Sequence, residues 1–155
     1  MKRLFLVCII VFFLSGCSLT QGVRNVREFF DLKEASELYN SETPDTIENK
    51  KSFEFHLGVP VSEDVRDILA YAELWTDSIY LFSFQAEEST IENILKIKQM
   101  SMQEMVESPI EKDLVWWDED LIDTFQKYHY SDDRSSRVLW YDEKNKQAFY
   151  QEFQF

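Results

Sequence analysis

His129 is the residue of this chain with the most suggestive neighbours for catalysis. A serine hydrolase combines a hydroxyl nucleophile, a His base and a carboxylate that orients the His. The nucleophile-elbow pattern G-x-S-x-G does not occur in the chain, and Ser and Asp also gather in loops because they form turns. We therefore expect no catalytic role for His129. The hydroxyls and carboxylates that follow it are Ser131, Asp132, Asp133, Ser135 and Ser136.

Metal chemistry has few candidate ligands in this sequence. Neither His56 nor His129 has the spacing of a zinc ligand, and no H-E-x-x-H pattern accompanies them. Acids at 118–120 and Asp123 offer oxygens for calcium, but the turn Gly and closing Glu of an EF-hand are missing. We expect His56 to be structural or exposed, the acids to open a helix, and no bound metal. A carboxylate pair for glycoside cleavage stays open, because only the separation of the acids in space would reveal it.

The four Trp residues are the second group of interest. Adjacent residues on a strand point to opposite sides, so Trp116 and Trp117 do not both face one core if they lie on a strand. An exposed Trp is typical of a binding site, whereas the alternative is core filling with one Trp at the rim. Core filling is the favoured interpretation, because large aromatics secure buried area in a small domain. Trp116 and Trp117 remain the candidate binding residues.

The first seventeen residues have the layout of a secretory signal peptide. Lys2 and Arg3 precede the apolar run Leu4 to Leu14, and small residues follow it. Eleven apolar residues are too few to span a bilayer comfortably. An uncleaved membrane helix and an ordinary secreted protein are the alternatives to a cleaved signal.

Residues Leu14-Ser15-Gly16-Cys17 resemble the lipobox of bacterial lipoproteins. The resemblance covers only the signal region. It implies cleavage before Cys17, a diacylglycerol on the Cys17 thiol and a fatty acid such as palmitate on the freed amino group. Ser18 is not the Asp that retains such lipoproteins in the inner membrane. For a Gram-negative host, this implies the outer membrane, facing the periplasm.

The chain carries a formal charge of -13, from 16 basic and 29 acidic residues. Nucleic-acid binding relies on clustered Lys and Arg, so this charge argues against a nucleic-acid partner. Removal of Lys2 and Arg3 with the signal makes the exported chain more acidic still. We expect a membrane contact through the lipid anchor, a protein partner in the envelope, no small-molecule ligand, and no cofactor besides the covalent lipid.

The chain divides into a signal peptide at 1–16, an N-terminal region at 17–52 and a globular domain at 53–155. The N-terminal region contains the lipidated Cys17, a polar tether and a segment of loosely helical apolar spacing. The polar stretch 40–52 contains Pro44, so we expect a loop there. Residues 53–57 alternate apolar and polar side chains, which predicts a half-buried strand.

Helices and strands follow each other through the domain. We expect a helix over 63–72, capped by Ser62, and a central strand over the aromatic and branched segment 78–84. A second helix starts at Ser89, where Ser89 and Glu92 match a capping box. The residues expected to face the core from these two helices are Val65, Ile68, Leu69, Ala72, Ile91, Ile94, Leu95, Met102 and Met105.

A third helix and a hairpin complete the predicted domain. Acids at 118–120 favour a helix start, and this helix is expected to run as far as Tyr128. After the polar loop 131–136, segments 138–141 and 148–153 flank the turn-forming stretch 142–146. The sequence therefore predicts an α+β fold, with helices on one face of a small mixed or antiparallel sheet and a C-terminal β-hairpin.

These observations lead to three functional hypotheses. The first is a lipid-anchored envelope lipoprotein with a non-catalytic binding or assembly role in the periplasm. The second is an immunity protein that neutralises an envelope-acting toxin, because acidic surfaces steer association with basic proteins. The third is an envelope hydrolase that uses carboxylates, which requires two convergent acids in a cleft.

Overall fold

The computed structural model describes residue 39 and residues 42–74, 77–103 and 108–155. All of them belong to one compact unit, Ser36–Phe155. The predicted signal peptide, Cys17, the tether and the apolar segment over 23–38 lie outside the described residues.

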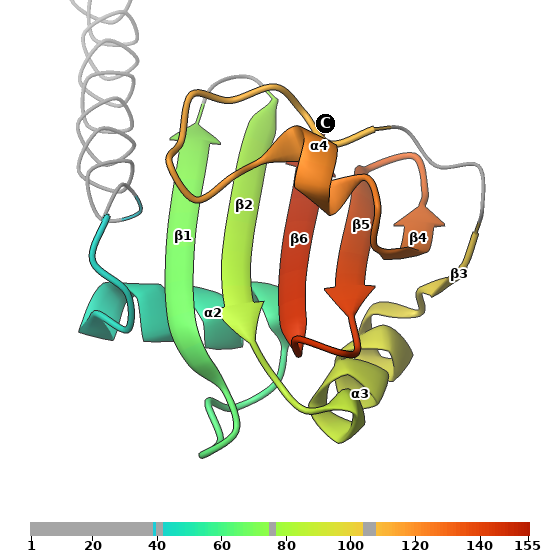
Figure 1. The fold of residues 1–155 in the computed structure, drawn as a ribbon. Helices are drawn as coiled ribbons and strands as arrows, with labels where there is room; N and C mark the ends of the chain where they lie inside the picture. The colour runs from blue at the N-terminus through green and yellow to red at the C-terminus, as the bar shows by residue number, and fades with distance from the viewer. Residues whose placement is uncertain (1–38, 40–41, 75–76, 104–107) are drawn as a thin grey trace, which may run out of the picture. The chain divides into compact units, whose positions relative to one another are not determined.

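A six-stranded antiparallel sheet forms the centre of the fold, in the order β1-β2-β6-β5-β4-β3 (Figure 1). The predicted α+β class is confirmed, and the sheet is antiparallel throughout the described strands. The predicted central strand is β2, and the predicted C-terminal hairpin is formed by β5 and β6. The strands are β1 (Arg66–Leu74), β2 (Ser78–Gln85), β3 (Ser101–Met102), β4 (Gln126–Ser131), β5 (Ser135–Asp142) and β6 (Gln147–Gln154).

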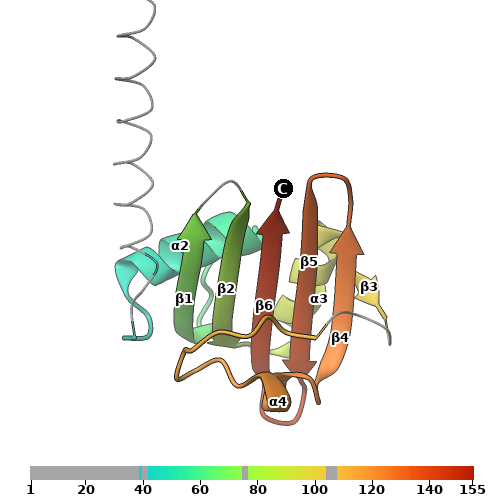
Figure 2. The same cartoon turned by 90° about the horizontal axis from the view of Figure 1, so that it is seen from above.

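Two helices, α2 (Ile47–Leu57) and α3 (Glu88–Lys98), cover one face of the sheet (Figure 2). The predicted helical layer is therefore present. The other face is covered by residues 108–125, which include the single-turn helix α4 (Glu119–Ile122). Within the described ranges, no helix is both long enough and apolar enough to span a membrane.

Alternation along the strands supplies both faces with apolar side chains. Phe82 and Phe84 of β2 face the helices, and Phe84 packs edge-on against Phe53 of α2 with ring centroids 4.9 Å apart. Leu81, which directly precedes Phe82, faces the opposite core instead. Because neighbouring strand residues point to opposite faces, one aromatic strand contributes to two cores.

The segment over 53–57 is helical, so the predicted strand there is wrong. Helix α2 begins at Ile47, inside the stretch expected to be a loop, and Thr46 caps it by accepting a hydrogen bond from Asn49 N at 3.1 Å. Phe53 and Leu57 are both fully buried, one helical turn apart. The short alternating run therefore fits a helix face equally well, and the N-cap with packing on the sheet decides for the helix.

The predicted helix over 63–72 is also wrong, because these residues lead into strand β1. Buried side chains alternate along it at Ile68, Ala70 and Ala72, and β1 pairs along its length with β2. The apolar residues between 65 and 72 match both a helical and an extended pattern. Pairing with β2 satisfies the backbone hydrogen bonds of the segment and selects the extended form.

The predicted third helix is reduced to the single turn α4. Its last predicted turn belongs to strand β4, which contains Tyr128. Helix α3 is confirmed, but its N-cap is Glu87 without a side-chain hydrogen bond, so the capping box at Ser89 does not form. Met102 lies on β3 and is 62% exposed rather than buried, and Met105 lies outside the described residues.

Candidate functional site

Trp117 fixes the segment that crosses the second face of the sheet. Its side chain is buried, and its indole Nε1 donates a hydrogen bond to Ile110 O at 2.9 Å. The ring packs edge-on against Trp140 and Phe149, with centroids 6.1 and 5.7 Å away. Edge-to-face contacts and a satisfied N–H are the usual way to bury a Trp. Trp117 is therefore a core residue of this face.

Trp116 lies at the rim of that core. Its ring is half-buried and stands edge-on to Trp117, with centroids 6.0 Å apart and an interplanar angle of 89°. The two residues sit in a turn, not on a strand, and both pack on the same core, Trp117 inside it and Trp116 at its rim. Of the two predicted binding residues, Trp116 is thus the one at the surface.

Apolar side chains continue outward from Trp116. Val115 is 97% exposed and Leu121, on α4, is 49% exposed. We call residues 110–118 the Trp116 loop. Its base is fixed by the Trp117 indole, by a hydrogen bond from Lys112 N to Glu119 Oε1 and by an ion pair between Lys112 and Glu73. The loop therefore holds exposed apolar side chains on an ordered base.

Exposed acidic residues lie close to these apolar residues in the sequence, and we call this group the acidic rim. The hydrogen bond to Glu73 raises the pKa of Lys112 above its ordinary value, although burial opposes the shift. Lys112 is thus engaged toward β1, with its Nζ also 5.7 Å from the Tyr71 ring centroid. Among the described residues, no Lys or Arg pairs with a member of the rim. The acidic rim consists of Glu111, Asp113, Asp118 and Asp120, all exposed.

A row of polar residues crosses the helix-covered face of the sheet. Strand pairing places Tyr80, Glu152, Arg137 and Tyr130 side by side on β2, β6, β5 and β4. Arg137 Nε donates to Glu152 Oε1 at 3.2 Å, and the Arg137 guanidinium lies 5.4 Å from the Tyr130 ring centroid. We call these four residues the polar row.

Glu152 is the centre of the polar row and is 3% exposed. Its Oε2 accepts from Tyr150 OH at 3.1 Å and faces His56 Nδ1 at 3.4 Å. Burial alone raises the pKa of Glu152, but the hydrogen bonds from His56 and Gln154 outweigh it and lower the pKa to about 2. A carboxyl held ionised in this way is a poor proton donor or acceptor near neutral pH.

The polar row therefore has the character of a structural ion-pair network. It contains one carboxylate, whereas glycoside cleavage needs two acids on opposite sides of a substrate. Glu152 could not be identified from the sequence, because its partners come from distant strands and from α2. His56 reaches it from the C-terminal turn of α2 and is buried, so of the two expectations for His56 the structural one holds.

His129 pairs with a serine but not with an acid. Its Nε2 lies 3.2 Å from Ser136 Oγ across the β4–β5 pair. The nearby carboxylate of Asp132 instead accepts hydrogen bonds from Arg134 N at 2.9 Å and Ser135 N at 2.8 Å, which lower its pKa. Asp132 therefore shapes the turn between the strands, and in the described part of the chain no carboxylate orients the His129 ring.

The acids considered for calcium have other partners. Asp118 caps α4 by accepting from Leu121 N at 3.0 Å, and Asp123 forms an ion pair with Lys127 at 2.7 Å. Glu119 accepts from Lys112 N. The part of the chain that the structure describes contains no group of three or more His, Cys, Asp or Glu side chains placed to hold a metal ion.

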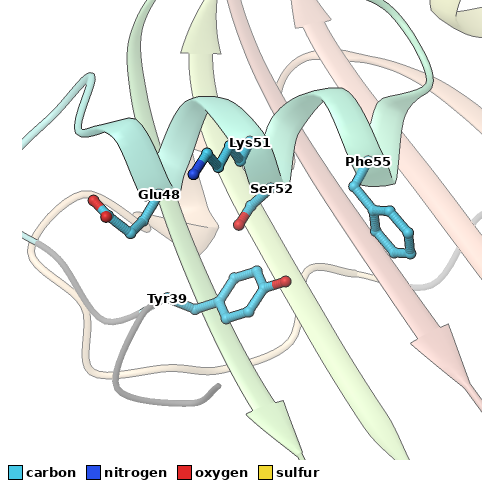
Figure 3. A pocket seen from close by; sticks show the side chains of 5 residues that line it. All are labelled: Tyr39, Glu48, Lys51, Ser52 and Phe55. Atoms are coloured by element: carbon cyan, nitrogen blue, oxygen red, sulfur yellow. The ribbon is translucent and has the colours of Figure 1, made fainter. Parts of the chain in front are cut away.

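A hollow of about 530 Å³ lies beside α2 (Figure 3). Ser52 is buried and Tyr39 half-buried, while the other lining residues are exposed. The hollow is open to solvent and carries one acid and one base, so it offers little enclosure for a small molecule. Its lining residues are Tyr39, Glu48, Lys51, Ser52 and Phe55.

No family model, curated protein or solved structure matches this chain. Its function can therefore be inferred only from its own residues. Cys17, the predicted lipidation site, lies outside the described residues. Within them, the Trp116 loop with its acidic rim is the surface feature with the clearest chemical character.

Proposed function

We propose that this protein is a lipid-anchored lipoprotein of the bacterial envelope with a non-catalytic binding or assembly role in the periplasm. The observation that carries the binding role is the Trp116 loop, where Val115 is 97% exposed beside a half-buried Trp. The lipobox-like residues ending at Cys17 support the anchor. No cofactor besides the covalent lipid is part of the proposal.

The fixed base of the Trp116 loop supports a role in binding. Exposed Trp residues dominate binding energy when they are presented on a rigid base, because little conformational freedom is then lost on association. Trp117 supplies that base through its hydrogen bond to Ile110 O and its contacts with Trp140. Trp116 is half-buried against that base, so its exposed part is available as the anchor, with Val115 beside it.

The anchor is tested by replacing Cys17 with Ala in the full chain. We expect the parent to incorporate labelled palmitate and to fractionate with the outer membrane, and C17A to lose the label and leave the membrane fraction. Two or three acyl chains bind a bilayer far more firmly than one, so the difference between fractions should be nearly complete. Equal, unlabelled membrane association of both forms would reject the anchor.

An immunity protein against an envelope-acting toxin is the second candidate function. The acidic rim favours it, because acidic surfaces accelerate association with basic proteins. Expression of the chain should then protect cells from a toxin encoded beside its gene, and lack of protection would count against this candidate. The carboxylate hydrolase has less support, since the buried Glu152 is held ionised and alone in the polar row.

A further inference from the structure

We infer that the Trp116 loop docks into an apolar pocket with a basic rim on a protein partner. This inference rests on the proposed binding role and specifies the partner's chemistry. Val115 and Trp116 would enter the pocket, and Leu121 of α4 would cover its edge. Exposure of Val115 at 97% and Leu121 at 49% leaves both side chains free to make these contacts.

Charge complementarity defines the partner. The acidic rim places four exposed carboxylates within a few residues of Val115 and Trp116, and Lys112 is already committed to Glu73. A ring of Lys and Arg on the partner would pair with these acids and would steer the encounter. Charged groups at the edge of an interface act mainly on the association rate, while the apolar centre determines how long the complex lasts.

The same charges disfavour the other occupants of this surface. Segments that dock on anionic lipid use Lys and Arg beside their Trp residues, whereas Trp116 is flanked by acids. A symmetric contact with a second copy would bring two acidic rims together, and like charges at an interface cost affinity. A basic protein surface satisfies both the apolar centre and its rim.

Photo-crosslinking in cells that naturally produce the protein provides the first test. The full lipidated chain carries p-benzoylphenylalanine at position 115, and a matched control carries it at position 47, where Ile47 is 66% exposed on α2. We expect one protein adduct from position 115 and none from position 47. The adduct should map to an apolar pocket bordered by Lys or Arg on the partner.

Affinity measurements on the crosslinked partner provide the second test. We expect Trp116→Ala to weaken binding roughly 30-fold, as for an interface hot spot. Val115→Ser should weaken binding with no effect on folding, because Val115 contacts solvent almost entirely. The double variant Asp113→Asn and Asp120→Asn should slow association and reduce its dependence on salt, while Ile47→Ser should leave binding unchanged.

Several results would overturn the inference. They are the absence of an adduct from position 115, an adduct with lipid, with a second copy or with residues 18–38 of the same chain, and a partner surface without basic residues. Unchanged affinity in both Val115→Ser and Trp116→Ala would also reject it. Failure of the anchor is seen separately in the fractionation of the Cys17 variant, so the two proposals fail independently.

Discussion

His56 Nδ1 lies 3.4 Å from Glu152 Oε2, and both side chains are buried at the junction of α2 and β6. The contact joins residues 96 positions apart in the chain. It connects the C-terminal turn of α2 to the polar row, while the positive charge of Lys98 on α3 also lowers the pKa of Glu152. The carboxylate of Glu152 on the sheet thus interacts with residues of both helices.

Acid should destabilise the protein through Glu152. Its pKa is lowered from 4.5 to about 2 in the folded state, so folding favours the ionised carboxylate. The resulting stabilisation is fully present above pH 4.5 and is lost as the pH falls toward 2. A shift of this size corresponds to about 3 kcal/mol in the free energy of unfolding. Urea unfolding between pH 2 and pH 7 measures it.

Glu152→Gln is the control for this acid dependence. The amide keeps the shape of the side chain but does not titrate, so the variant should be less stable at pH 7 and should lose less stability between pH 4.5 and 2. Asp132→Asn serves as a matched comparison, because Asp132 is an exposed acid whose pKa is also lowered. An unchanged acid slope in Glu152→Gln would show that other carboxyls dominate the transition.

Replacement of His56 should separate the roles of its two ring nitrogens. Nδ1 faces Glu152, whereas Nε2 is buried without a hydrogen-bond partner in the described residues. His56→Ala removes both nitrogens and leaves a cavity, with an expected loss of about 3 kcal/mol in unfolding free energy. His56→Asn retains a donor near the position of Nδ1 and should lose clearly less. Equal losses would mean that packing, not the Glu152 contact, sets the effect.

The sequence correctly predicted a helix or strand where the spacing of apolar residues fits only one of the two. Segment 78–84 is apolar on both sides and forms the strand β2, which is paired on both edges. The residues between 65 and 72 match two periodicities, and pairing with β2, which no local pattern encodes, decides between them. The expectation from adjacency held only for a strand, whereas Trp116 and Trp117 lie in a turn and both pack on the second core. Their arrangement matches the favoured interpretation of core filling with one Trp at the rim.

The polar row could not be predicted from the sequence. Tyr80, Arg137 and Glu152 are brought together by the register of β2, β5 and β6, and a shift of one residue would point Glu152 to the other face. The acidic rim, in contrast, is local in sequence, but the sequence pattern singled out only its acids at 118–120, as the start of a helix. What the sequence could not reveal is that Lys112 forms its ion pair with Glu73 and not with a member of the rim.

Gly58 ends α2 and should resist substitution. Its φ of +76° is in the left-handed region, and its N–H donates to Glu54 O at 3.0 Å as a C-cap. A Cβ at this position would also lie 3.0 Å from Ile97 Cγ2. We expect Gly58→Ala to cost about 1–2 kcal/mol in unfolding free energy.

A second variant separates the two causes at Gly58. Ile97→Ala removes the nearby methyl group, so Gly58→Ala should cost less in an Ile97→Ala background if the close approach matters. Ile97 is 48% exposed, which makes its own truncation mild. The same cost in both backgrounds would assign the effect to the left-handed backbone alone.

Substitution of Trp117 should mainly lower stability, whereas substitution of Trp116 should mainly weaken binding. Trp117 packs on Trp140 and Phe149 in the second core, so Trp117→Ala should lower the free energy of unfolding by about 3–5 kcal/mol. Trp116→Ala removes a half-buried rim residue and should cost about 1 kcal/mol. Trp117→Phe keeps most of the apolar volume but loses the hydrogen bond to Ile110 O, and an intermediate loss is expected. Chemical unfolding of the three variants measures this order, and a larger loss for Trp116→Ala than for Trp117→Ala would contradict the assignment of Trp117 to the core and Trp116 to the surface.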